Sequence, residues 1–585
     1  MVHAAQAAPP QARRLWIDRP WVDLLIGCGG WSAPLLIVSY LLLDKDAQRW
    51  ASVFYGLALV CNYPHYMATV HRAYARGEDR AQYRLFTYYL TGLLLIIAAA
   101  AHVRPVLLPW LFTIYVMWSP WHYTGQNFGL TMMFLRRAGA NVAPRERRWL
   151  RISFVASYAM LLAAFNQGGS PGPGHDPLVL SLSVPQTIAL AIEIAAGIVF
   201  LGAGALALVP IARRIEISTL LPAATLYITQ ACWFVIPIAM TWASAVPAPQ
   251  TRYSSGILAV MHSAQYLWIT RHYAQRDAAR RPAAHWSNLS YWGTLVVGGV
   301  ALFLPGPWLA SYVGHFDFTS SMLIVTAIVN IHHFMLDGVV WKLRDPRVSQ
   351  ALVDNAAPDA GAGALSKPGR AGKTVAVWIT RPVVVAVLIT LAALDQWRYT
   401  LAQRDTDPSA LETASALNPY DGSVHLKLAR FLIESGRYED AYARCQLILA
   451  QRPNDVDTLV NAGVLAYRLN DPKAAETWWT RAVTQNPNLR EVHLYLAELI
   501  DADGRTRDAL PHYERYLELL TQQSSEHAPP DARQTALVLV KFADGLSSTG
   551  QASAAKTQYD LAMRIAQKAG LSDVEALARQ HANAY

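Results

Sequence analysis

The chain has 585 residues, of which 53% are hydrophobic and 16% are charged, and it contains 19 tryptophans. This composition is too apolar for an ordinary soluble protein and the length is too great for one domain, so we expect a polytopic membrane protein. The net charge of +9 comes from basic residues spread over short loops rather than gathered on one face, so we expect no nucleic-acid partner.

Residues 1–20 are expected to form a cytoplasmic N-terminal segment, because they are charged and lack the apolar core of a signal peptide. A polytopic membrane domain is predicted over 21–394. It contains about eleven stretches with the roughly twenty apolar residues needed to cross about 30 Å of hydrocarbon. These stretches are 21–43, 52–74, 85–103, 106–135, 149–166, 184–210, 218–243, 254–274, 289–312, 319–342 and 374–394.

The loops predict the orientation of these stretches. Lys and Arg residues follow every even-numbered stretch, whereas the opposite loops, such as 168–177 and 244–250, have almost none. Because basic residues are retained on the cytoplasmic side, the N-terminus is expected inside. An odd number of spans then places the C-terminal region outside. We therefore expect an inner-membrane protein whose C-terminal region is periplasmic or extracytoplasmic.

Four of the predicted spans carry histidines at a similar depth below the basic loops. Polar groups are costly in hydrocarbon, so ionisable residues there usually face the interior of the bundle and have partners. A carboxylate lies four residues after one of these histidines, on the same helix face. The predicted core of a buried metal site is therefore His65, His122, His262, His332, His333 and Asp337.

Five neighbouring residues are secondary candidates: Asn62, Gln126, Gln265, His71 and His272. The three amides lie about one helical turn from a core histidine and could hydrogen-bond around the ligands. His71 and His272 fit the helical period of the core histidines less well, and could instead meet lipid phosphates. The alternative for every one of these histidines is a hydrogen bond that only joins two helices.

From about residue 395 the chain becomes polar and repetitive, with 395–421 predicted as a linker and 422–580 as a repeat domain. Prolines, alanines, turn residues and small residues recur every 34 residues, at Pro419, Pro453 and Pro487, at Ala441, Ala475 and Ala509, at Gly436, Asn470 and Gly504, and at Ala429, Gly463 and Ala497. A fourth unit follows an insertion of about twelve residues around 522–532. This pattern resembles the tetratricopeptide repeat. The resemblance implies a stacked helical solenoid that binds a protein or peptide partner.

The membrane half resembles, in general character, the histidine-rich membrane iron oxygenases, which are fatty-acid desaturases and hydroxylases and the carotenoid-cleaving Brp/Blh type. The resemblance implies an iron-dependent oxidoreductase that acts on a lipid or isoprenoid. The chain departs from the desaturase pattern, because the histidines of "IVNIHH" have no earlier histidine to complete an HxxxH or HxxHH box. Imidazole and carboxylate ligands also suit zinc or copper.

The expected fold is thus all-α, with a polytopic transmembrane helix bundle followed by an α-solenoid. Two other functions remain open. In the first, pairs of the histidines hold haem b axially and the protein carries electrons. In the second, the protein is a non-enzymatic membrane scaffold that recruits envelope proteins through its repeats.

Overall fold

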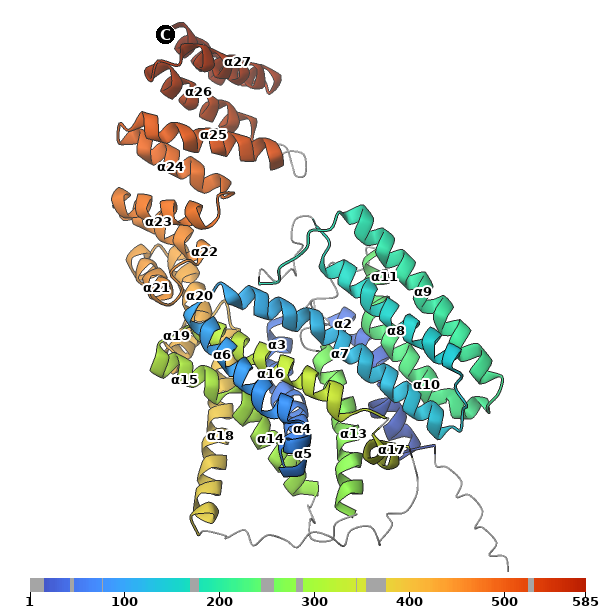
Figure 1. Cartoon of the computed structure of the whole chain (residues 1–585). Coiled ribbons are helices and arrows are strands. Elements are labelled where there is room, and N and C mark those ends of the chain that lie inside the picture. Colours follow the sequence, from blue (N-terminus) through green and yellow to red (C-terminus); the bar gives the residue numbers. More distant parts are fainter. Residues whose placement is uncertain are drawn as a thin grey trace, which may run out of the picture. The chain divides into compact units, whose positions relative to one another are not determined.

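The computed structural model describes residues 15–42, 47–75, 77–168, 178–242, 257–279, 288–343, 345–353, 375–523 and 531–584. Within these ranges the chain is helical apart from turns and one isolated bridge between Gln167 and Val184, which confirms the all-α prediction for the described residues. The chain divides into two compact units, Met1–Arg404 and Asp405–Tyr585 (Figure 1).

The first unit is built from helices of very different lengths (Figure 1). In chain order, with π-helical turns labelled η, they are α1 (Pro20–Val22), η1 (Asp23–Gly27), α2 (Ser32–Leu42), α3 (Ala47–Leu57), η2 (Ala58–Asn62), α4 (Tyr63–Tyr74), α5 (Gly77–Gln82), η3 (Leu85–Leu90), α6 (Thr91–Val103), α7 (Leu107–Arg137), α8 (Pro144–Phe165), α9 (Gln186–Ala212), α10 (Ile217–Gln230), η4 (Ala231–Val235), α11 (Ile236–Trp242), α13 (Ala259–Ala279), α14 (Asn288–Phe303), α15 (Pro305–Gly314), α16 (Phe318–Val340), α17 (Pro346–Leu352) and α18 (Val375–Ala402).

Seven helical stretches among the described residues are long and apolar enough to cross a membrane. They are Leu85–Val103, Pro144–Phe165, Gln186–Ala212, Ile217–Trp242, Leu289–Gly314, Phe318–Val340 and Pro382–Ala402. The predicted number of about eleven is not confirmed. The predicted stretches 21–43, 52–74, 106–135 and 254–274 are not among the seven. The first is interrupted between Gly27 and Ser32, and the other three carry the polar side chains that the histidine site requires.

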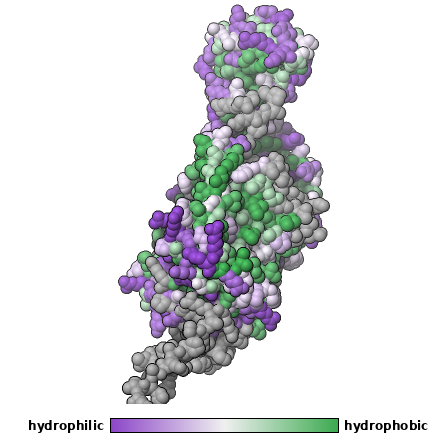
Figure 2. Space-filling model, turned by 90° about the vertical axis from the view of Figure 1, so that its right-hand side faces the viewer, coloured by the Kyte–Doolittle hydropathy of each residue, from purple (hydrophilic) through white to green (hydrophobic). Residues whose placement is uncertain are grey.

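The outer helices of the first unit expose large apolar side chains. On α9, Ile198 and Leu201 are 66% and 63% exposed, and on α6 Leu95 and Ile96 are 63% and 68% exposed. Figure 2 shows broad hydrophobic areas on the visible face of the molecule beside a compact hydrophilic patch. An apolar surface of this extent marks a binding face for protein or lipid.

Four helices carry the predicted core histidines: α4, α7, α13 and α16. Helix α16 packs against both α4 and α7, and α13 packs against α4. Helix α14 supports α4 from another side through a close backbone approach at Gly299. A Cβ atom at Gly299 would lie 2.6 Å from the carbonyl carbon of Tyr63, so only glycine allows this contact. The contact is two residues before His65, and it therefore positions that histidine.

The second unit is a series of helix pairs. Its helices are α19 (Pro408–Leu417), α20 (Gly422–Glu434), α21 (Tyr438–Gln451), α22 (Val456–Arg468), α23 (Pro472–Gln485), α24 (Arg490–Ala502), α25 (Thr506–Gln523), α26 (Ala532–Ser548), α27 (Ala552–Lys568) and α28 (Ser572–Ala584). Helices α20, α22 and α24 begin 34 residues apart, and so do their partners α21, α23 and α25. The predicted insertion lengthens α25 and then lies largely outside the described residues.

The segment expected to be a linker, 395–421, is mostly helical. Its first residues continue α18 to Ala402, and its remainder contains α19, which packs against α20. The division between the units therefore falls after Arg404 rather than near residue 395. Within the repeats, the predicted turn residues Gly436, Asn470 and Gly504 all adopt positive φ angles, of 72°, 59° and 79°. A left-handed residue ends each first helix of a pair and starts the turn to the second.

In the repeats, the smaller the residue at the small position of one helix, the larger the aromatic side chain that packs on it from the next helix. Gly463 on α22 faces Trp479 on α23, and a Cβ atom at Gly463 would lie 2.3 Å from the indole Cδ1. One repeat later the equivalent positions are Ala497 and Tyr513, both buried. The glycine therefore matches the larger tryptophan, and alanine matches the smaller tyrosine.

Gly463→Ala is expected to lower the free energy of unfolding of the second unit by about 1–3 kcal/mol, because the added methyl group overlaps the buried Trp479 ring. The measurement is urea unfolding of a fragment spanning 405–584, followed by circular dichroism. The double variant Gly463→Ala with Trp479→Tyr recreates the pairing of the next repeat and should recover part of the loss. Equal stability of wild type and Gly463→Ala would contradict the packing described above.

Candidate metal centre

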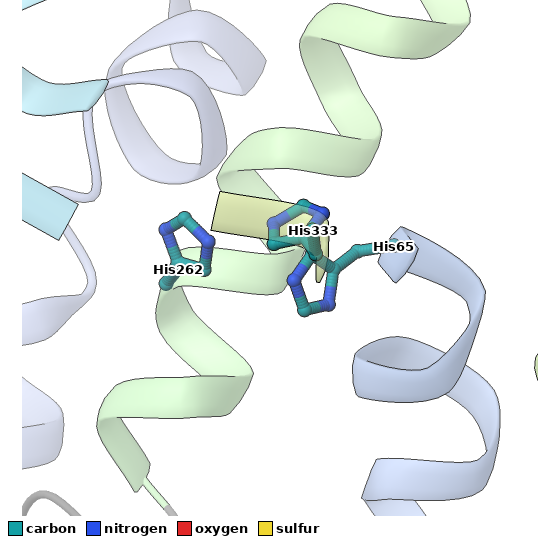
Figure 3. Close-up of side chains that lie close together, drawn as sticks. All are labelled: His65, His262 and His333. Carbon is teal, nitrogen blue, oxygen red and sulfur yellow. The ribbon is translucent and has the colours of Figure 1, made fainter. Parts of the chain in front are cut away.

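Four imidazole rings from four helices form a closed array. The ring centroids of His65 and His262 are 5.2 Å apart, those of His262 and His122 are 4.9 Å apart, those of His122 and His333 are 4.8 Å apart, and those of His333 and His65 are 4.7 Å apart. Figure 3 shows His65, His262 and His333 projecting from their separate helices into the space between them. Rings in contact at this spacing leave no slot in which a flat porphyrin could lie between two histidines.

His65 and His262 form the enclosed side of the array. The side chains of His65 and His262 are 1% and 0% exposed. His65 Nδ1 donates to the backbone carbonyl of Asn62, which fixes the proton on Nδ1, and it also lies 2.9 Å from Ser263 Oγ. His65 Nε2 and both ring nitrogens of His262 have no hydrogen-bond partner. Buried nitrogens of this kind are rare without a ligand, because an unsatisfied polar group costs about 1–3 kcal/mol.

His333, His122 and Asp337 form the second side. The Nε2 atoms of His333 and His122 are 3.2 Å apart, and Asp337 Oδ2 lies 3.5 Å from the first and 3.8 Å from the second. Thr69 Oγ1 is 2.9 Å from His333 Nδ1 and 2.9 Å from Asp337 Oδ1. The hydroxyl has one proton, so it donates to the carboxylate and accepts from His333 Nδ1–H. The Nε2 lone pair of His333 is then directed at His122 and Asp337.

One carboxylate oxygen of Asp337, Oδ1, is held by hydrogen bonds, and the other, Oδ2, faces the histidines. Tyr266 donates from its hydroxyl to Asp337 Oδ1 at 2.8 Å, and Trp341 Nε1 donates to the Tyr266 oxygen at 2.7 Å. The chain Trp341–Tyr266–Asp337 thus fixes the carboxylate and leaves Oδ2 facing the histidines. Hydrogen-bonded partners that orient a ligand in this way are typical of metal sites.

Two groups of side chains could each hold a metal ion. They are His65 with His262 and His333, and His122 with His333 and Asp337, and within each group the ligand atoms lie within 4.8 Å of one another. Metal–nitrogen bonds are about 2.0–2.1 Å long, so ligand atoms around one ion are up to about 4.2 Å apart. The separations of 3.2, 3.5 and 3.8 Å in the second group are within this limit, whereas the first group, spread over up to 4.8 Å, would have to contract around an ion.

The second group opens into a cavity. His122 and Asp337 line a hollow of about 520 Å³, together with aromatic and apolar side chains such as Trp118 and Phe334. Of the described residues that line it, none belongs to the enclosed group. Structural metal sites are closed, whereas catalytic sites keep one position open to substrate. The geometry of the second group is of the open kind.

The structure brings five of the six predicted core residues together and separates the sixth. His332 lies outside the array, where its Nε2 is 3.0 Å from both the Tyr74 hydroxyl and Thr91 Oγ1. The structure therefore does not place it with the other five. Consecutive helical residues point about 100° apart, so His332 cannot share the face on which His333 and Asp337 lie. It joins α16 to α4 and to α6 instead.

The secondary candidates divide in the same way. The side-chain oxygen of Asn62 accepts a hydrogen bond from the Ser263 hydroxyl, and the backbone carbonyl of Asn62 accepts one from His65 Nδ1. Gln126 donates to Gln265, and Gln265 donates to the carbonyl of Gly27. These amides therefore join helices next to the array. His71 and His272 lie outside it, with His71 beside the Tyr291 ring and His272 hydrogen-bonded to the backbone of Ala351 on α17.

Thr69, Ser263 and Trp341 support the array but are absent from the predicted set. Thr69 is four residues after His65, and Trp341 is four residues after Asp337. Residues at this spacing lie on one helix face. A search for polar side chains one turn from each candidate ligand would have found both. Ser263 has no such signal, because its contact with His65 depends on how α13 packs against α4.

Comparisons with known proteins find one family model and several solved structures. A family model described as tetratricopeptide repeat matches residues 409–462. No curated protein matches the chain. Among solved structures, MamA is 16% identical with a TM-score of 0.24, covering 28% of this chain and 88% of its own. YrrB, described as a TPR protein with an unusual peptide-binding site, is 16% identical with a TM-score of 0.24, covering 34% and 89%. Yeast Tom70 is 12% identical with a TM-score of 0.19, covering 88% and 95%.

Proposed function

We propose that this chain, whose second unit is a tetratricopeptide-repeat domain that binds a protein or peptide, is a membrane metalloenzyme with its metal in the four-histidine array. The observation that carries the proposal is the set of buried ring nitrogens of His65 and His262 that no protein group satisfies. Coordination to a metal ion in the enclosed group would give a partner to His65 Nε2 and to one ring nitrogen of His262.

Iron is the metal that the open group fits best. Two histidines and one carboxylate, here His122, His333 and Asp337, are the ligand set of non-haem iron oxygenases. Neither group contains a cysteine, so a soft-metal or iron–sulfur site finds no support among the described residues. Zinc and copper share the preference for imidazole and remain the alternatives. Iron bound here would supply redox chemistry, so we assign the protein as an oxidoreductase.

The chain's own residues orient the ligands and exclude water. Thr69 and Tyr266 hold Asp337, and the Asn62 carbonyl fixes the ring of His65. Trp118 and Phe334 line the cavity next to His122, so an apolar part of a substrate can approach the open position without water. A lipid or an isoprenoid has such an apolar part.

Two features support a location in the bilayer. Seven helical stretches have the length and apolarity of membrane spans, and α6 and α9 expose large apolar side chains. With the eleven predicted spans and the basic loops on the cytoplasmic side, the N-terminus would lie in the cytoplasm and the repeat domain outside the inner membrane. The repeats then recruit an envelope protein to the enzyme.

Metal analysis of the full chain tests the proposal. Protein expressed with added iron and purified in detergent without chelator should contain about one equivalent of iron by mass spectrometry, because both groups share His333. A Soret band would instead establish the haem b carrier. Protein with no stoichiometric metal or haem would leave the non-enzymatic scaffold, in which the histidines only join helices.

A further inference from the structure

A second cavity adjoins the one at the metal centre. It has a volume of about 810 Å³, and it shares with the first the lining residues Trp121, Gly125, Gly129, Gly338, Trp341 and Leu343. Because the two cavities share these lining residues, they lie side by side along α7, and together they are called the hollow below. One end of the hollow is the open edge of the metal centre at His122 and Asp337.

The other end of the hollow is basic. Arg136, Arg147, Arg151 and Lys342 line the second cavity, and no aspartate or glutamate is among the described residues that line it. Arg147 and Arg151 lie one turn apart on α8, and both are exposed. Guanidinium groups bind carboxylate and phosphate oxygens in pairs of parallel hydrogen bonds. This end therefore has the chemistry to hold an anionic headgroup.

Glycines leave the middle of the hollow open. A Cβ atom built on Gly125, Gly129 or Gly338 would meet no atom within 4 Å, so these glycines do not serve close helix packing. Phe128 and Met132 of α7 and Phe154 and Val155 of α8 complete an apolar wall. The space suits a hydrocarbon chain.

We propose that this hollow binds a single-chain anionic amphiphile, with its carboxylate or phosphate headgroup at Arg147 and Arg151 and its chain directed toward His122 and Asp337. Along α7 the hollow extends from His122 to Arg136, about 21 Å at 1.5 Å per residue, so it has room for a long chain. The inference rests on the proposed function, because it names the substrate class of that site. Binding itself requires no metal, since no metal ligand lies near the arginines.

Binding is tested on full-length protein in detergent, by displacement of the fluorescent fatty acid cis-parinaric acid. The competitors are palmitate, farnesyl phosphate and hexadecanol. At least one of the two anions should displace the probe, and the tighter one identifies the headgroup as carboxylate or phosphate. The double variant Arg147→Gln with Arg151→Gln should weaken that anion at least tenfold and leave hexadecanol unchanged. The metal-free variant His333→Ala should bind the anion as the wild type does, which separates this inference from the metal assignment.

Filling the hollow provides a second test. Gly129→Leu should weaken every competitor at least tenfold, because its side chain occupies the shared part of the two cavities. Gly202→Leu on α9 is the matched control, since a Cβ atom there also meets nothing within 4 Å and Gly202 lines neither cavity. The proposal is overturned if neither anion binds, if hexadecanol binds as tightly as both anions, or if the Gly129 and Gly202 variants behave alike.

Discussion

His333→Ala is expected to empty the metal centre, whereas His332→Ala should leave its metal content unchanged. His333 belongs to both groups of ligands, and its Nε2 lies 3.2 Å from His122 and 3.5 Å from Asp337. Loss of a hydrogen-bonding partner of a ligand lowers metal affinity about 10- to 100-fold, and loss of a shared ligand should exceed that. Metal per chain, measured after dialysis against a weak chelator, compares the two variants.

The two histidines make a matched pair, because both are in the middle of α16 and each makes hydrogen bonds to neighbouring helices. A general loss of structure would affect both variants. Gel filtration in detergent verifies that each remains monodisperse. If His332→Ala lost metal while His333→Ala kept it, the assignment of faces on α16 would be wrong.

Gly299→Ala is expected to disrupt the first unit, while Gly293→Ala on the same helix should have little effect. A Cβ atom at Gly299 would lie 2.6 Å from the Tyr63 carbonyl carbon and 2.9 Å from Pro64 N, and backbone atoms cannot rotate away. Overpacking typically costs about 1–3 kcal/mol, and a rigid contact between two backbones lies at the upper end of this range. The variant should melt at a lower temperature in detergent and should hold less metal, since α4 carries His65.

Gly293 provides the control because a Cβ atom there would meet nothing within 4 Å. Both substitutions raise helix propensity equally, so the difference between them isolates the contact of α14 with α4. Similar melting temperatures for the two variants would show that α14 does not approach α4 as closely as described.

The sequence predicted the helices of the site better than its individual residues. The even-numbered spans with histidines correspond to α4, α7, α13 and α16, because the cost of a polar group among apolar residues is visible in sequence alone. The spacing pairs His333 with Asp337, but the groups that His332 contacts were not visible. These groups depend on how α16 is rotated about its axis, and the rotation is set by packing against α4 and α7.

The repeat domain was more predictable than the first unit for a related reason. In the repeats, each helix packs on neighbours that are close in sequence, so the 34-residue period reveals the contacts. In the first unit, Thr69 bonds Asp337 across 268 positions of the chain. No local pattern encodes such a contact.

The distance along the chain between the ligands also determines when the centre can form during synthesis. His65 is made early, but Asp337 follows only after about 270 further residues, which takes tens of seconds at roughly 5–20 residues per second. Until α16 leaves the ribosome, His65, His122 and His262 have neither His333 nor Asp337 beside them. If the centre binds iron as proposed, uptake of the ion would be one of the last steps in maturation of the first unit, because a chain that stops before α16 lacks His333 and Asp337.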